Sequence, residues 1–233
     1  MATSEEVKNY YDSFNEHQRE LGINVRHRTI FKNLKKAGLK PGSNVLEIGC
    51  GIGTVSHLIL RYLKRGSYVG VDISPDNIRT AKIKNSFHKN AEFFVDDMSN
   101  FVSSRKFDFI VFPDVLEHIP VEQHKRIFES ISTVSTDNVT VVINIPEPYT
   151  LDWHRRNNSG ALQIIDQSLS MKDLCNDCYP FGFYLYSMVP YGLQYQHEEY
   201  LSIILKKDFV RETIVTKSKF QLGLQNYKAK VGS

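Results

Sequence analysis

The middle of the chain alternates between two kinds of segment, and this alternation restricts the fold more than any other feature. Short apolar runs rich in β-branched residues occupy 43–49, 67–73, 91–96, 107–112 and 138–145. Stretches with apolar residues at helical spacing lie between most of them, at 55–64, 78–87 and 121–131. Strands that alternate with helices favour a parallel sheet with helices on both faces, so we expect an α/β protein.

Two helix starts are marked by their residue types. Ser74 can cap the helix that follows the second strand, Pro75 suits its first position and Asp76 suits its positive end. Pro120 marks the start of the helix after the fourth strand in the same way.

The second half of the chain has a different texture. Residues 146–182 hold two prolines, a tryptophan and many polar residues, and we expect an irregular insertion there. Two further strands, at 183–189 and 198–205, are expected to form a hairpin-like pair. The tail from Asp208 onward is basic and weakly patterned, and predicts a peripheral strand or helix with a frayed end.

Composition argues against several classes of protein. Hydrophobic residues make up 41% of the 233 residues, and no apolar run reaches the ~18 residues of a membrane span. The polar N-terminus has no apolar signal core, so we expect a cytoplasmic protein without a membrane partner. The net charge of +3, spread over scattered lysines, gives no basic stripe for nucleic acid. We interpret Cys175 and Cys178 as free thiols rather than half a zinc site or a redox pair, because no second pair exists.

A glycine-rich loop follows the first expected strand. Gly49, Gly51 and Gly53 stand between that strand and the first helix, where glycines allow a sharp turn and a close approach to a ligand. Asp72 lies about 20 residues further on, at the end of the second strand, where an acid can accept hydrogen bonds from ribose hydroxyls. Together these features predict an adenosine-containing cofactor.

Two departures from the nicotinamide fingerprint narrow the choice of cofactor. The third glycine comes one residue early, because Thr54 stands where G-x-G-x-x-G requires glycine. Glu47 lies just before the glycines, where a carboxylate would repel a pyrophosphate but attract the amino group of an amino-acid cofactor.

Four motifs in this order resemble the class I S-adenosylmethionine-dependent methyltransferases. They are VLEIGCGIG, VGVDIS, FFVDDM and FDFIVFPDVLEHI, and the resemblance covers roughly residues 40–145. It implies a Rossmann-like, seven-stranded, mostly parallel sheet with an insertion between strands 5 and 6. It also implies S-adenosylmethionine as the cofactor.

The resemblance implies a role for particular residues. Asp72 matches the ribose acid, and Asp97 the acid that meets the adenine amino group, although Asp96 is an alternative because the register of the pair is open by one. Met98 packs beside the adenine. The remaining cofactor-binding positions that it implies are Glu47, Gly49, Cys50, Gly51, Gly53, Ile73, Phe112 and Pro113.

The first 40 residues look like the N-terminal lid of small-molecule members of this family. Tyr11 could cover the cofactor, and Arg26 or Arg28 could pair with its carboxylate. The predicted organisation is one methyltransferase domain, made of a lid, a cofactor-binding core, an acceptor-binding insertion, a strand pair and a basic tail at 1–40, 41–145, 146–182, 183–207 and 208–233.

A hydroxyl acceptor needs a proton acceptor near the end of the fourth strand. His118 follows that strand and is the first candidate base; His197, His154 and Asp166 are further candidates. Asp114, Glu117 and His118 form a D-x-x-E-H pattern that some methyltransferases use to hold a divalent ion, but many relatives carry it without metal, so we predict none.

The resulting hypothesis is methyl transfer to a hydroxyl of a small molecule or sugar by a monomer or homodimer. An N-methyltransferase acting on a small amine is the nearest alternative. A nicotinamide oxidoreductase and a cofactor-binding module without catalysis are alternatives of another class. A nucleic-acid methyltransferase is less favoured, because FPDV replaces an N-P-P-Y-like motif after the fourth strand.

Overall fold

A computed structural model describes residues 22–158, 160, 162–163, 165–207 and 215–231. The elements, in chain order, are α2 (Val25–Lys36), β1 (Val45–Ile48), α3 (Thr54–Tyr62), β2 (Tyr68–Asp72), α4 (Pro75–Lys84), β3 (Ala91–Val95), β4 (Phe107–Pro113), η1 (Leu116–His118), α5 (Val121–Val134), β5 (Ser135–Pro146), α6 (Pro148–Asn157), α7 (Met171–Cys178), η3 (Tyr179–Phe181), β6 (Phe183–Tyr191), β7 (Tyr200–Lys207) and α8 (Lys219–Val231).

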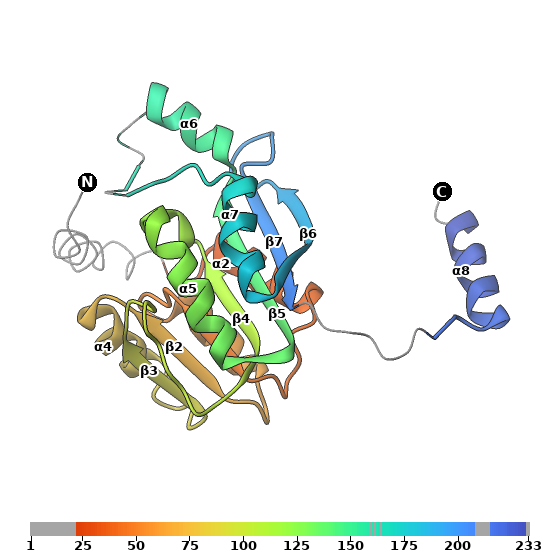
Figure 1. The fold of residues 1–233 in the computed structure, drawn as a ribbon, viewed down its shortest axis with the longest axis horizontal. Helices are drawn as coiled ribbons and strands as arrows, with labels where there is room; N and C mark the ends of the chain where they lie inside the picture. Colours follow the sequence, from red (N-terminus) through yellow and green to blue (C-terminus); the bar gives the residue numbers. More distant parts are fainter. Residues whose placement is uncertain (1–21, 159, 161, 164, 208–214, 232–233) are drawn as a thin grey trace.

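The strands form one seven-stranded sheet in the order β3-β2-β1-β4-β5-β7-β6 (Figure 1). Strands β1 to β5 pair in parallel, whereas β7 pairs antiparallel with both β5 and β6. This confirms the predicted seven-stranded, mostly parallel sheet and its terminal antiparallel pair.

Helices cover both faces of the sheet, as the alternation predicts. On one face, Ile30 of α2, Val55 of α3 and Ile78 of α4 share a buried core. On the other face, Phe128 of α5 and Leu174 of α7 belong to a second core. The two cores are separated by strands whose side chains alternate between them.

The predicted helix starts are confirmed, and one expectation is corrected. Ser74 caps α4 by accepting a hydrogen bond from Asn77 N, and α5 begins directly after Pro120. The segment 146–182, expected to be irregular, contains the helices α6 and α7. Helix α7 is apolar on one face and buries Leu174 and Cys178, a pattern that the prolines and polar residues around it obscured. Cys50, Cys175 and Cys178 form no disulfide.

None of the helices in the described residues is long and apolar enough to cross a membrane. The described part of the tail, residues 215–231, includes helix α8, which Figure 1 shows apart from the sheet.

Candidate functional site

The carboxyl ends of the parallel strands lie along one edge of the sheet, and the loops that follow them carry most of the predicted site residues. In open α/β sheets, ligands bind in the crevice outside these ends, at the point where the strand order reverses. Here that point lies between β1 and β4, because β2 and β3 extend the sheet to one side and β5, β7 and β6 to the other.

The loop after β1 requires its glycines. Gly49, Gly51 and Gly53 have φ angles of 71°, 53° and 76°, in the left-handed region that disfavours other residues. A Cβ atom on Gly49 would lie 2.3 Å from Val115 Cγ2, and one on Gly53 would lie 2.6 Å from Asn85 Nδ2. The loop is therefore held close to its neighbours and exposes backbone to the crevice.

Asp72 ties this loop to the end of β2. Gly51 N donates to its Oδ2 at 2.8 Å, while Ser74 N and Asn77 Nδ2 donate to its Oδ1 at 3.0 and 2.9 Å. The carboxylate thus shapes the glycine loop and stands at the position expected for the ribose acid.

Glu47 does not occupy the open position that its place before the glycines suggested. Its side chain is fully buried; Tyr68 Oη donates to its Oε2 at 2.5 Å, and Ser56 Oγ lies 2.7 Å from the same hydroxyl. Burial raises the pKa of Glu47 to about 8, although the hydrogen bonds from Tyr68 and Ser56 oppose this shift. The predicted direct contact between Glu47 and the amino group of the cofactor is therefore wrong; Glu47 instead supports the glycine loop from beneath.

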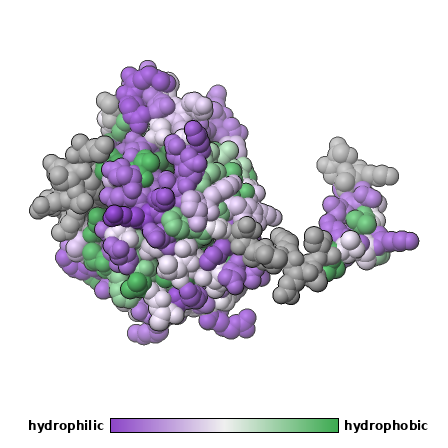
Figure 2. All heavy atoms as spheres, viewed as in Figure 1, coloured by the Kyte–Doolittle hydropathy of each residue, from purple (hydrophilic) through white to green (hydrophobic). Residues whose placement is uncertain are grey.

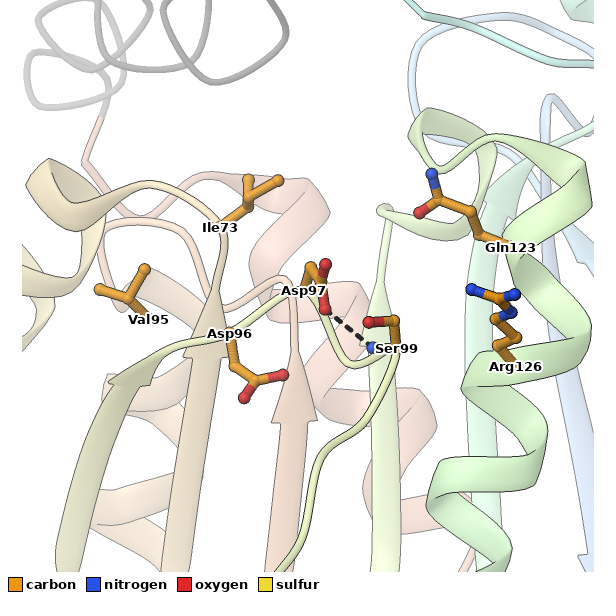
Figure 3. Close-up of a pocket in the computed structure, with 7 residues that line it drawn as sticks. All are labelled: Ile73, Val95, Asp96, Asp97, Ser99, Gln123 and Arg126. Atoms are coloured by element: carbon orange, nitrogen blue, oxygen red, sulfur yellow. Dashed lines mark hydrogen bonds between the residues drawn. The ribbon is translucent and has the colours of Figure 1, made fainter. Parts of the chain in front are cut away.

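A pocket of about 420 Å³ opens beside the ends of β2 and β3 (Figure 3). Ile73 supplies an apolar wall, the loop after β3 supplies acids, and α5 supplies polar side chains from the opposite side. Its lining residues are Ile73, Val95, Asp96, Asp97, Ser99, Gln123 and Arg126.

The structure separates the two acids of the loop after β3. The Asp96 carboxylate accepts a hydrogen bond from Met98 N at 2.6 Å, and its pKa is raised by partial burial. Asp97 is exposed, and Ser99 N donates to its Oδ1 at 2.9 Å. Figure 3 shows the Asp97 carboxylate drawn toward Ser99 and the open space facing α5. Asp97 therefore fits an adenine contact better than Asp96 does.

Three predicted cofactor residues lie in the interior. Met98 is 1% exposed, with a φ of 64° that turns its side chain inward. Phe112 is fully buried and packs against Phe128, at 6.3 Å between ring centroids, so its predicted contact with the cofactor is wrong: it is a core residue. Cys50 is buried, and burial raises the pKa of its thiol. Pro113 is half-buried at the end of β4.

A cluster of buried polar side chains lies next to the end of β4. Arg26 Nη1, on α2, is 3.1 Å from Asp114 Oδ2. Burial opposes the charge of Arg26, but Asp114 and Tyr200 of β7 outweigh it and raise the pKa of Arg26. The ring of Tyr200 stacks on Tyr191 of β6, with 5.6 Å between centroids. Asp114 N donates to Asn144 O at 2.9 Å, which brings the end of β5 into the same cluster.

This cluster holds several buried polar atoms that no hydrogen bond satisfies within the described residues. They are the side-chain oxygen and nitrogen of Asn144, the hydroxyl of Tyr191, Oε2 of Glu117 and both carboxylate oxygens of Asp114, which has the ion pair with Arg26. Such groups cost free energy unless a ligand or water pairs with them, so they are typical of a site for a polar molecule.

His118 binds the insertion rather than standing open to the crevice. Its Nδ1 is 2.6 Å from Ile165 O and 3.0 Å from Asp166 Oδ1, and its Nε2 is 3.6 Å from Glu117 Oε1. Burial alone would lower the pKa of His118, but Glu117 and Asp166 outweigh burial and raise it to about 9. An imidazolium cannot accept a proton, so the predicted base role of His118 at neutral pH is corrected to a positioning role.

The other predicted bases are distributed as follows. Asp166 is paired with His118, as described. His154 Nε2 lies 3.4 Å from the hydroxyl of Tyr195, whose ring stacks on the exposed His197 at 5.4 Å. These two histidines therefore form a second group, on α6 and on the loop between β6 and β7.

Of the two lid arginines, Arg26 faces the site, whereas Arg28 is exposed on α2. Tyr11 lies outside the described residues. Among those residues, no group of three or more histidine, cysteine or acidic side chains is arranged to hold a metal ion.

Sequence reasoning missed several residues that the fold brings together. Asn144 and Tyr200 looked like strand residues, and Asp114 was considered only as a metal ligand. The one available signal was the polar Asn144 inside an otherwise apolar strand, which periodicity alone did not single out. Arg126 and Gln123 of α5 looked like ordinary exposed helix positions.

Comparison with known families gives a match over most of the chain. Residues 16–187 match a family model described as a methyltransferase domain. The chain is also 38% identical over 73 residues to malonyl-[acyl-carrier protein] O-methyltransferase 1 of Ilyobacter polytropus. That match covers 31% of this chain and 27% of the relative, so it spans about a quarter of the relative's length.

Solved structures share the fold along nearly their whole length. Magnesium protoporphyrin IX methyltransferase from Synechocystis PCC 6803 with bound SAH superposes with a TM-score of 0.65 at 18% identity, covering 86% of this chain and 98% of that one. The N-methyltransferase NodS from Bradyrhizobium japonicum WM9 gives a TM-score of 0.60 at 18% identity, covering 83% and 97%.

Proposed function

The chain belongs to the methyltransferase domain family, and from this membership we propose that it binds S-adenosylmethionine and transfers its methyl group to a hydroxyl of a small-molecule or sugar acceptor. One observation carries the proposal: the loop 49–53, Asp72 and Asp97 follow the ends of three adjacent parallel strands. This cofactor requires exposed backbone for its methionine portion, an acid for its ribose, and an acid beside an apolar wall for its adenine.

The residues present fit the cofactor. Asp97 offers an exposed carboxylate in a pocket that also contains apolar Ile73, which suits the amino edge and the face of adenine. Asp72 fixes the loop through Gly51 N, so one carboxylate can shape the loop and receive ribose hydroxyls. When bound, S-adenosylmethionine supplies an electrophilic methyl group on a sulfonium.

The acceptor side of the proposal uses the polar cluster at the end of β4. The chain's task is to align the acceptor hydroxyl, exclude water and take up its proton. Asp114 is the group best suited to accept that proton. Its side chain is 5% exposed, and burial raises its pKa although Arg26 and His118 oppose this. Its Oδ2 has the ion pair with Arg26, and its Oδ1 has no hydrogen bond within the described residues. Asn144 and Tyr191 then orient the acceptor.

Methylation of a small amine is the second candidate. Asp114 and Glu117 beside the stacked pair Tyr191 and Tyr200 form an acidic and aromatic environment, which also suits an ammonium group. The structural likeness to an N-methyltransferase is compatible with this alternative.

Cofactor binding tests the first half of the proposal. Calorimetry should detect binding of S-adenosylmethionine and S-adenosylhomocysteine but not of NAD. Asp72→Ala should weaken binding by about 1–3 kcal/mol, because a buried group loses its partner. Asp76→Ala, at a half-buried acid in the first turn of α4 that pairs with Arg79, is the matched control and should bind normally. Binding of NAD without binding of S-adenosylhomocysteine would refute the cofactor assignment.

A panel of acceptors tests the second half. Radiolabelled S-adenosylmethionine would be offered with neutral sugars and phenols in one arm and small amines in the other. Label transferred to hydroxyl compounds supports the first candidate, and label transferred to amines alone supports the second. Cofactor binding with no transfer to either arm would favour a module without catalysis.

A further inference from the structure

Helix α8 is a surface that the proposed function does not use. Every residue from 215 to 228 is exposed, and Figure 1 shows the helix apart from the sheet. Figure 2 shows hydrophobic residues on it next to strongly hydrophilic ones. An isolated helix of this length is marginal in water, so α8 needs a partner surface to be stable.

Three apolar residues of α8 form a stripe. Phe220, Leu224 and Tyr227 stand at positions i, i+4 and i+7, which share one face of a helix. They are 80%, 47% and 65% exposed. Leu222 is also 47% exposed but lies roughly opposite the stripe, at about 100° of rotation per residue.

The charges around this stripe all have one sign. Residues 215–233 contain Lys217, Lys219, Lys228 and Lys230 and no acidic residue. These four positive charges exceed the net charge of +3 of the whole chain, so the rest of the chain is not basic. Lys219 directly precedes Phe220 and Lys228 directly follows Tyr227, which sets one lysine about a quarter turn to each side of the stripe.

We propose that α8 binds the surface of an anionic lipid bilayer, with the stripe Phe220, Leu224 and Tyr227 in the headgroup region. Long lysine side chains at the two edges of an apolar stripe can extend to lipid phosphates while their stems lie along the hydrocarbon boundary. Helix α8 contains Lys219, Lys228 and Lys230, and Lys217 lies two residues before it. A cluster of about four basic residues at an amphipathic helix is typical of segments that bind anionic lipid. With 13 residues, α8 is about 20 Å long, too short to span a bilayer, so it lies in the interface.

Charge argues against two other partners. A second copy of the tail carries the same positive charges and would repel the first. The exposed residues Met188 and Val189 of β6 pair with Ile203 and Ser202 of β7, and β6 contains no acid for the tail. An anionic bilayer supplies both the negative charge and the apolar layer. The sequence predicts no membrane partner, because the chain has no apolar run long enough to span a bilayer and no apolar signal core; binding of α8 to a bilayer surface departs from that expectation.

Vesicle co-sedimentation of the full chain tests the proposal. One set of vesicles is phosphatidylcholine alone, and the other is phosphatidylcholine mixed with phosphatidylglycerol. The wild type should sediment with the mixed vesicles only. The bound fraction should fall when salt near 1 M shortens the Debye length to about 3 Å.

Two pairs of variants separate the stripe from the rest of the helix. Leu224→Ser should weaken partitioning by about tenfold or more, since a buried leucine is lost, whereas Leu222→Ser, with equal exposure and equal chemistry, should not. Lys219→Glu combined with Lys228→Glu should abolish binding, while Lys82→Glu on α4 should leave it intact. Thermal unfolding of each variant shows that the fold is retained, independently of cofactor binding.

Several outcomes would overturn the proposal. They are equal binding to both vesicle types, no binding by the wild type, and equal effects of the two leucine variants. A dimer that forms without vesicles and is lost in Leu224→Ser would assign the stripe to a second copy. Tighter binding to duplex nucleic acid than to vesicles, insensitive to Leu224→Ser, would assign the lysines to nucleic acid.

Discussion

At the scale of single residues, the protonation of the buried acids is the most informative property of this protein. Glu47 sits inside β1 with no exposed surface, bonded to Tyr68. An acid in such a place remains protonated to a higher pH than in the unfolded chain, because burial disfavours its charge. The folded protein therefore holds a proton that the unfolded chain has already released.

Glu47 should make stability fall as pH rises. Its folded pKa of about 8 lies above the ordinary value of 4.5 for a glutamate. The folded state therefore binds more protons between these two values, and unfolding becomes easier as pH rises. The slope is at most about 1.4 kcal/mol per pH unit. Glu47→Gln, which stays neutral, should flatten this slope and be more stable than wild type above pH 8 when the free energy of unfolding is measured by denaturant titration.

The control for this measurement is an exposed acid. Glu129→Gln on α5 should leave the slope unchanged, because an exposed carboxyl meets the same solvent in both states. A Glu47→Gln profile that falls with pH as steeply as the wild type would show that Glu47 does not hold the proton.

Asp114 should accept the proton of the acceptor hydroxyl; this prediction rests on the proposed function. Asp114→Asn should lower kcat by about 10²–10⁴, the usual value of general-base assistance, and leave the affinity for S-adenosylhomocysteine nearly unchanged. A base acts when it is deprotonated, so the wild-type rate should rise as pH rises through the pKa of Asp114. Burial raises this pKa above the ordinary value of 3.8 for an aspartate. The variant should lack this limb. Asp173→Asn, exposed on α7, should behave as wild type.

Two results would count against Asp114 as the base. One is unchanged turnover in Asp114→Asn when methyl transfer is rate-limiting. The other is loss of cofactor affinity with normal turnover of the bound complex, which would make the ion pair with Arg26 part of the cofactor site.

At the scale of elements, the insertion between β5 and β6 is fastened to η1 by several contacts. Gln167 N donates to Glu117 O at 3.0 Å, and Gln167 Nε2 donates to Ile119 O at 2.6 Å. His118 adds its contact with Asp166, whose carboxylate also accepts from Gln163 N at 2.7 Å. These contacts position the insertion beside the end of β4. This position fits the predicted role of the insertion, which is to bind the acceptor.

Asp166→Ala should weaken the contacts between the insertion and η1 without affecting cofactor binding. We expect faster proteolytic cleavage in residues 158–170 and a higher KM for the acceptor, with unchanged affinity for S-adenosylhomocysteine.

The contact between His118 and Asp166 should also weaken at alkaline pH. The folded pKa of His118, about 9, lies above the ordinary value of 6.5 for a histidine, so its stabilising contribution is complete below pH 6.5 and is lost as pH rises through 9. Cleavage followed against pH measures this directly.

Glu198→Ala is the control at the same edge of the sheet, since Glu198 is exposed between β6 and β7. If Asp166→Ala is cleaved no faster than Glu198→Ala at neutral pH, the ion pair with His118 does not hold the insertion.

At the scale of the whole molecule, the sheet with its covering helices carries the stability and α8 carries none of it. The residues from 215 to 228 are all exposed, whereas Leu205 of β7, just before the tail, is completely buried. Deleting residues 217–233 should therefore change the free energy of unfolding by less than about 0.5 kcal/mol, as for a surface change. Leu205→Ala should cost about 2–5 kcal/mol. A large loss of thermal stability on deletion would mean that α8 packs on the body in solution.

Most of the fold was predictable because its signals are local. The β-branched runs, the helical spacing of apolar residues and the Ser74-Pro75 start act within a few residues, so each can be read without knowledge of the rest. The helices α6 and α7 were not predicted, since polar residues and prolines in 146–182 hide two short amphipathic segments whose apolar faces are defined by what they pack against.

By itself, the sequence determined the sheet, the glycine loop and the acids at the strand ends, because each depends on the backbone conformation of its own segment. Only the tertiary structure decided that Arg26 faces Asp114, that Phe112 is core and that His118 meets Ile165, 47 positions away. Burial and ion pairing decide the charge of a side chain, and both are set by residues distant in sequence. That is why the motifs predicted a cofactor site, while the protonation of its acids and histidine required the fold.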